Sequence, residues 1–175
     1  MSLAPRTLGD AFDTFRCEAF RLETLDDYGG SGNVDAYRAF LDGQTKPEDY
    51  NADWLEEVRA WTASGRRVYR VHAVTRPLSA YLHFELGWGY RTNATAGEEF
   101  FILDLTDRPS PLPPGVGDFW LFDSITAATM RYTSDARFLG ADVLPDEQSA
   151  AFVGYRDAAL AHAVPFQEWW SKYGT

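Results

Sequence analysis

GRRVYRVHAVTRPLSAYLHFELGWGYRTNATAGE, residues 65–98, is the stretch that decides the fold. It begins at 67–75 with β-branched residues and tyrosine, which are typical of a β-strand. Alternate residues of a strand point to the same side, so Arg70 and His72 share one side with two valines. We therefore expect an interior strand whose Arg70 and His72 are approached by carboxylates from elsewhere in the chain, because buried polar groups need partners.

The second part of this stretch is a helix that begins at a proline. Pro77 suits a first helical turn, and we expect the helix over 78–87. Tyr81 and Glu85 are four residues apart, so their polar ends can reach the same point. His83 projects from the same helix, two residues from each of them.

A polar loop and another strand complete the stretch. Residues 90–97 show neither a helical nor a strand period, and we expect a loop that contains Asn93. Glu98 then precedes a run at 99–105 that is apolar on both sides, a pattern typical of a covered strand.

More sheet follows. DFWLFD at 118–123 predicts a strand bounded at both ends by aspartate, Asp118 and Asp123. The runs at 127–133 and 138–144 are joined by a short polar turn and predict an antiparallel hairpin. We expect the DFWLFD strand to lie next to the strand of the central stretch.

Apolar residues at spacings of three and four predict amphipathic helices on both sides of this sheet. Before the central stretch, the helices are expected at 7–20, 34–41 and 53–64. After it, a long helix is expected at 146–163 and a last helical turn or two at 165–173.

These elements predict one α+β (or α/β) domain over 1–175, with a helical part at about 7–64 and a sheet-containing part at about 65–175. We expect a central mixed sheet of about five to six strands, including the antiparallel hairpin, with helices packed on it. A chain of 175 residues, 45% of them hydrophobic, is long enough to bury such a core.

Charge and cysteine content exclude several classes of partner and site. A formal net charge of -10 argues against direct binding to a nucleic-acid backbone, which requires a surplus of Lys and Arg. Cys17 is the only cysteine, so neither an internal disulfide nor a cysteine-based zinc site can form. No secretory signal is visible and no apolar run approaches the roughly 20 residues that span a bilayer. We expect an acidic cytoplasmic protein with no membrane partner.

The chain resembles an uncharacterised family of small actinobacterial proteins, a domain of unknown function often found beside helix-turn-helix regulators. The resemblance lies in RVHAVTRPLSAYLHFE, NATAGE and DFWLFD, in this order, with RLETL near the start and VPFQEWW near the end, and so covers most of the chain. The family has no established activity, so the resemblance implies none. It does imply a helix-turn-helix regulatory protein as a partner. His83 and Phe101 stand where the family commonly has basic residues, so a pocket that is basic in relatives is less basic here.

The order of strand, helix, strand and hairpin is also similar to a half-unit of the phospholipase-D-like fold, which serves as a sensor domain in some regulators. The catalytic form of that fold needs a His-x-Lys element. None of His72, His83 and His162 is followed two residues later by lysine. We therefore expect such a half-unit without the catalytic motif, and a phosphodiesterase is disfavoured.

The sequence also lacks other common catalytic motifs. The chain has no Gly-x-Ser-x-Gly elbow, no His-Glu-x-x-His helix and no dinucleotide fingerprint. Glu85, Glu98, Asp118 and Asp123 could gather into a divalent-ion or general acid–base site, because paired carboxylates shift each other's pKa. The favoured alternative is that they neutralise the arginine and histidines of the central stretch and cap backbone groups. We predict no catalytic residue, no metal and no cofactor.

Polar and aromatic residues of the three motifs are the candidates for binding a small ligand or a partner. They are Arg70, His72, Tyr81, His83, Glu85, Asn93, Glu98, Asp118, Trp120 and Asp123.

Three functions remain open on the sequence. The first, favoured by the acidic charge and the lack of catalytic signatures, is a non-enzymatic regulatory or partner-binding module, a sensor that works with a separate helix-turn-helix regulator. The second is a small enzyme of unrecognised type, which requires Tyr81, Glu85, Glu98 and Asp123 to lie within hydrogen-bond reach of one another. The third is a toxin–antitoxin component.

Overall fold

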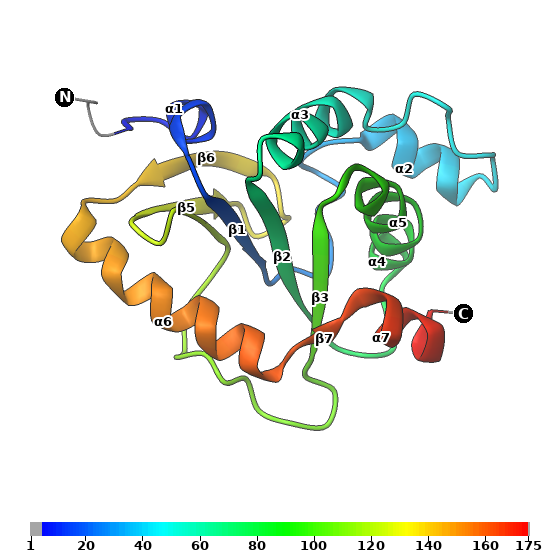
Figure 1. Cartoon of the computed structure of the whole chain (residues 1–175). Coiled ribbons are helices and arrows are strands. Elements are labelled where there is room, and N and C mark those ends of the chain that lie inside the picture. Colours follow the sequence, from blue (N-terminus) through cyan, green and yellow to red (C-terminus); the bar gives the residue numbers. More distant parts are fainter. Residues whose placement is uncertain (1–4, 175) are drawn as a thin grey trace.

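The protein is a single α+β domain built on a mixed sheet, and the computed structural model describes residues 5–174. Seven strands lie in the order β6-β5-β4-β1-β2-β3-β7 (Figure 1). β2 is parallel to β1 and β3, and the other neighbouring pairs are antiparallel. The strands are β1 (Glu18–Glu23), β2 (Arg67–Val74), β3 (Glu99–Asp104), β4 (Phe119–Phe122), β5 (Thr126–Tyr132), β6 (Phe138–Val143) and β7 (Val164–Pro165).

Helices cover both faces of this sheet (Figure 1). They are α1 (Leu8–Thr14), α2 (Val34–Leu41), α3 (Ala52–Ala63), α4 (Ala80–Phe84), the π-helix η1 (Glu85–Tyr90), α5 (Arg91–Asn93), the 3₁₀-helix η2 (Ala94–Ala96), α6 (Asp146–His162) and α7 (Phe166–Tyr173). The expected α+β class, the single domain and the hairpin β5–β6 are confirmed. The described helices include none that is both long and apolar enough to cross a bilayer.

The N-terminal part differs from its prediction, because the helix expected at 7–20 is only half helical. Thr7 caps α1 in a capping box with Asp10, and the chain becomes extended at Phe15. EAFRLE then forms β1, in which the last four residues, FRLE, alternate between apolar and polar. β1 lies between β2 and β4, so the prediction that DFWLFD neighbours β2 is wrong.

The two faces of the sheet differ in chemistry. On one face, apolar side chains of β1, β2, β3 and β4 pack under α6; they include Phe20, Leu22, Tyr69, Val71, Leu103, Phe119 and Leu121. The other face carries the intervening residues, and these are charged at the centre of the sheet. Arg21 lies opposite Arg70 and Glu23 lies opposite His72 in the parallel register of β1 and β2. Buried charge is therefore concentrated on one face.

The helix expected at 78–87 begins two residues later, at Ala80, and extends further than its sequence indicates. Ser79 caps α4 through its side chain, and the helix continues through η1, α5 and η2 until Gly97, whose φ of 103° ends it. The loop predicted at 90–97 is therefore wrong. Tyr90, Asn93 and Ala96 are buried there, which shows that tertiary packing overrides the weak local helix pattern.

Candidate functional site

Arg70 is the centre of the buried charge. Its guanidinium donates to Glu98 and lies 3.3 Å from Glu23. The rings of Trp54 and Trp120 lie on it at 5.4 and 5.2 Å, and Trp54 Nε1 also donates to Glu98 at 2.8 Å. The neighbouring carboxylates raise the pKa of Arg70 despite its burial, so the side chain stays charged. The predicted approach of carboxylates to this strand is confirmed.

A second buried pair lies beside it on the same face. Arg21 donates to Asp118 at 2.8 Å, and both side chains are at most 5% exposed. Asp118 also accepts from the hydroxyls of Tyr28 at 2.5 Å and Thr24 at 2.6 Å, and from the Thr24 amide at 2.9 Å. Four donors thus satisfy one carboxylate, which fixes the start of β4 against the end of β1.

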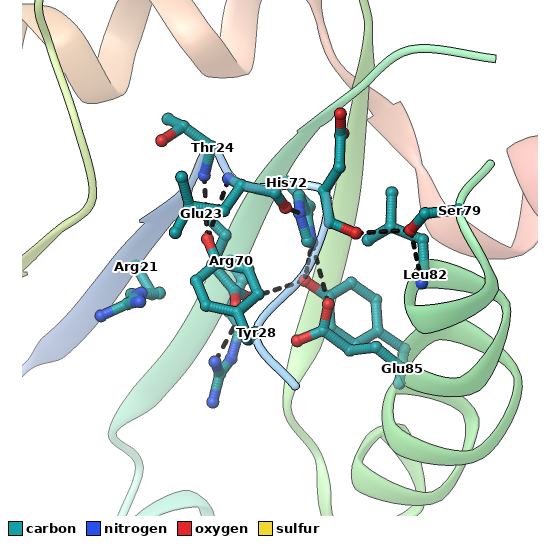
Figure 2. A network of polar contacts seen from close by, with 12 residues as sticks. Arg21, Glu23, Thr24, Tyr28, Arg70, His72, Ser79, Leu82 and Glu85 are labelled. Carbon is teal, nitrogen blue, oxygen red and sulfur yellow. Dashed lines mark hydrogen bonds and ion pairs between the residues drawn. The ribbon is translucent and has the colours of Figure 1, made fainter. Parts of the chain in front are cut away.

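His72 is fully buried, and its two ring nitrogens have different surroundings. Nε2 lies 2.9 Å from the Leu25 carbonyl oxygen, which can only accept, so Nε2 carries a hydrogen. Nδ1 lies 3.0 Å from the Tyr90 hydroxyl and 3.4 Å from Glu85 Oε2. The Tyr90 hydroxyl donates to Glu23 Oε1 at 2.7 Å. Nδ1 therefore faces a group of oxygens (Figure 2).

The pKa values of two carboxyl groups of this cluster are shifted in opposite directions. Burial alone would raise the pKa of Glu23, but the charges of Arg70 and Arg21 and the hydrogen bond from Tyr90 outweigh it and hold that pKa at about 2. Burial, and then the negative charge of Glu23, raise the pKa of Glu85 well above its usual value. Glu85 therefore releases its proton less readily than the neighbouring Glu23.

The π-helix η1 explains how Glu85 and Tyr90 reach the same point. In an α-helix, residues five apart lie about 140° apart around the axis. The i→i+5 bonding of a π-helix brings them to the same side. Glu85 and Tyr90 are the first and last residues of η1, and both are directed at His72. π-helical turns are frequent at functional sites.

A pocket of about 230 Å³ opens onto the cluster, and we call it the η1 pocket. Glu85, Arg70 and Tyr90 form its polar end, and one buried oxygen of Glu85, Oε2, has no hydrogen-bond partner in the described part of the chain. The remaining lining is aromatic, amide or glycine: Asn33, Tyr50, Asn51, Trp54, Tyr81, Phe84, Gly89 and Asn93.

Three asparagines form a chain of amides along the η1 pocket. Asn33 Nδ2 donates to Asn51 Oδ1 at 3.0 Å, and Asn51 Nδ2 donates to Asn93 Oδ1 at 3.1 Å. Asn33 and Asn51 have φ of 51° and 57°, a left-handed conformation that asparagine tolerates better than most residues. These two residues precede α2 and α3, so the chain of amides ties both helices to α5.

Most of the predicted site residues gather in this region. Arg70, Tyr81, Glu85 and Asn93 line the η1 pocket. The others that belong to the buried network are His72, Glu98, Asp118 and Trp120.

Two predicted residues do not belong to the site. Asp123 accepts hydrogen bonds from the backbone amides of Arg16, Cys17 and Glu18, at the other end of β1 from Glu23. The ends of β1 are about 16 Å apart, so the cluster of Tyr81, Glu85, Glu98 and Asp123 that the alternative of a small enzyme requires does not form. His83 is half-buried, and its ring has no hydrogen bond or ion pair with the residues described.

Sequence reasoning missed several members of the network. Arg21 and Glu23 come just after the helix expected at 7–20 and were not assigned to a strand, although the alternation in FRLE, residues 20–23, was a visible strand signal. Tyr90 was placed in a loop. The sequence around Tyr28 and Trp54 gives no indication of a polar site. A single aromatic residue in a loop or on an amphipathic helix is more often part of the hydrophobic core.

Comparisons with known proteins identify the family of the chain. No curated protein matches the chain. Among solved structures, phosphatidylserine synthase of Haemophilus influenzae Rd KW20 is similar at 9% identity with a TM-score of 0.44; the match covers 89% of this chain. This chain spans about a third of the synthase, 35% of its length, and nothing about substrate or chemistry follows from so distant a likeness. Residues 6–171 match the model of a protein family that is described as Domain of unknown function (DUF6879). Because this match includes nearly all of the domain, with every residue of the network, the chain belongs to the DUF6879 family.

Proposed function

We propose that this protein is a cytoplasmic, non-enzymatic sensor module that binds a small polar molecule in the η1 pocket. The observation that carries the proposal is Glu85 Oε2, a buried oxygen with no hydrogen-bond partner among the described residues, at the end of a cavity of about 230 Å³. A buried polar atom without a partner is costly. A ligand that donates a hydrogen bond to it would remove this cost.

The lining indicates what such a ligand looks like. Pockets for small molecules combine apolar walls with a few polar groups that fix orientation. Here the walls are the rings of Tyr50, Trp54, Tyr81 and Phe84. Aromatic faces beside a carboxyl group favour an amine or a hydroxyl-bearing molecule with a small apolar part. The volume suits a metabolite smaller than a typical drug.

Binding without chemistry is favoured because the strongest charged groups already have partners inside the protein. Arg70 is held by Glu98 and Glu23, and Asp118 accepts four hydrogen bonds. Groups held so tightly position the strands and are poorly placed to exchange protons with a substrate. Occupation of the pocket would instead act on Glu85 and Tyr90, and through η1 on the position of α5.

A substitution at Gly89 tests the proposal. Gly89 is helical and lines the pocket, and a Cβ there would lie 3.3 Å from the Tyr50 hydroxyl and 3.8 Å from Glu85 Cγ. Gly89→Val should fill the pocket. Gly154→Val is the matched control, because Gly154 lies in α6 and a Cβ there contacts nothing within 4 Å.

We expect at least one member of a panel of small amines, polyols and sugars to stabilise the wild type in thermal unfolding. At about 100 times its Kd, a ligand adds about 2.7 kcal/mol, which corresponds to about 5 to 10 °C for a chain of this size. Gly89→Val should abolish the shift and Gly154→Val should keep it. An equal shift in both variants would place binding elsewhere. Mass spectrometry of the recovered ligand tests the alternative of an enzyme, since a catalyst would return a changed molecule.

We also propose that the sensor acts on a separate helix-turn-helix regulator. The net charge of -10 supports a division of labour in which another protein contacts DNA. Copurification should recover a helix-turn-helix regulatory protein in a complex whose amount changes with pocket ligand. If neither the ligand-loaded nor the ligand-free protein retains the regulator, this part of the proposal is wrong.

A further inference from the structure

The buried network contains more negative than positive side chains. Its carboxyl groups are those of Glu23, Glu85, Glu98 and Asp118, and its guanidinium groups are those of Arg21 and Arg70. Glu98 and Asp118 each lie 2.5 to 2.8 Å from one arginine, and Glu23 has only a share of Arg70 at 3.3 Å, so Glu23 and Glu85 carry the surplus of negative charge and form the surplus pair. If both were ionised, Glu23 and Glu85 would carry more negative charge than the shared Arg70 can neutralise in this interior. One divalent cation would neutralise both.

The surplus pair surrounds a suitable third donor. Glu23, His72 and Glu85 each offer one ligand atom, and the three atoms lie within 4.8 Å of one another. His72 Nδ1 and Glu85 Oε2 are 3.4 Å apart, which is about the separation of two ligands bound to one tetrahedral zinc ion at 2.0 to 2.1 Å. Glu85 Oε2 is also the atom that lacks a hydrogen-bond partner among the described residues.

The second ring nitrogen of His72, Nε2, contacts the kind of acceptor that metal-binding histidines use. Such histidines donate their other ring N–H to a carboxylate or backbone carbonyl, which fixes the tautomer and the orientation of the ring. His72 Nε2 is 2.9 Å from the Leu25 carbonyl oxygen. Because the Tyr90 hydroxyl can give its hydrogen to Glu23, the Nδ1 lone pair is available to an ion.

We propose that Glu23, His72 and Glu85 bind one divalent transition metal ion, Zn²⁺ or Mn²⁺, at the end of the η1 pocket. Imidazole with carboxylates suits these ions, and three protein ligands leave a coordination position for a molecule in the pocket. Glu85 and Tyr90 line the pocket, which provides the route to the site. Only the route to the metal site, through the η1 pocket, rests on the proposed function.

Isothermal titration calorimetry of chelator-treated protein with ZnCl₂, and then MnCl₂, tests the site. We expect one ion per chain in the wild type. Glu85→Gln keeps the shape of the side chain and should weaken binding at least about 10- to 100-fold, since even outer-shell partners of a metal matter this much. His72→Gln should do the same. Thermal unfolding without metal shows which variants are folded, and Glu85→Gln alone decides the matter if His72→Gln does not fold.

His83→Gln and Glu99→Gln are the matched controls, because both residues are close in sequence to the site and outside the cluster. They should keep the wild-type affinity. Equal zinc affinity in the wild type and in folded Glu85→Gln would overturn the proposal, as would an equal loss in His83→Gln.

Gly89→Val separates this inference from the proposed function. If the variant loses small-molecule binding and keeps zinc affinity within about threefold, both proposals hold. Zinc binding that depends on Glu85, with no pocket ligand in the wild type, keeps the metal site and removes the sensor of small molecules. A pocket ligand blocked by Gly89→Val, with no zinc binding to the wild type, keeps the sensor and removes the metal site.

Discussion

Replacing Arg70 by methionine is expected to lower the free energy of unfolding by about 3 to 5 kcal/mol, the range for breaking a buried ion pair. The substitution leaves Glu98 and Glu23, both at most 3% exposed, without their guanidinium partner. It also removes the cation between the rings of Trp54 and Trp120. Urea unfolding monitored by tryptophan fluorescence measures the loss.

Arg67→Met is the control for this prediction. Arg67 is three residues earlier in β2 and also pairs with a glutamate, Glu99, at 2.7 Å, but these two side chains are 43% and 47% exposed. Exposed pairs contribute about 0 to 1 kcal/mol, so the loss should be small. If the two variants lose equal stability, the charges around Arg70 do not hold the sheet together in the way that we describe.

Asp118→Ala is expected to cost about 3 to 5 kcal/mol for a related reason. The variant leaves the Arg21 guanidinium buried without its carboxylate, and leaves the hydroxyls of Tyr28 and Thr24 without their acceptor. β1 and β4 should separate at this end, so amide hydrogen exchange in β4 should rise together with the loss of stability.

Asp142→Ala provides the comparison. Asp142 pairs with Arg131 across β5 and β6 at 2.7 Å, with both side chains just over half exposed. We expect a loss below about 1 kcal/mol there. A loss for Asp118→Ala as small as that for Asp142→Ala would mean that Arg21 finds another partner or water.

The part of the fold that the sequence predicts best is the part with clear periodicity. β2 was expected at 67–75 and runs from Arg67 to Val74, with Arg70 and His72 on one face as the alternation indicated. The hairpin and α6 likewise lie within two residues of their predicted ends. Local hydrophobic patterns are enough to predict a helix or strand where one of its faces is buried.

The partners of those strands could not be predicted in the same way. Arg21 and Asp118 are 97 residues apart, and Arg70 and Glu23 are 47 apart, so only the topology brings them together. The two aspartates of DFWLFD illustrate the difficulty. They bracket the same short strand, yet Asp118 neutralises an arginine and Asp123 accepts from backbone amides. Which end of β4 lies in the site depends on the antiparallel pairing with β1.

Whether Glu85 is a binding group is tested most directly by a high-resolution crystal structure of the protein purified from cells without chelators. We expect electron density for a bound species within hydrogen-bond or coordination distance of Glu85 Oε2 in the wild type. An anomalous signal would mark it as a metal ion, and its absence would mark it as an organic molecule. A structure in which Glu85 contacts only protein atoms and water, in wild type and Gly89→Val alike, would contradict the assignment of the η1 pocket as a binding site.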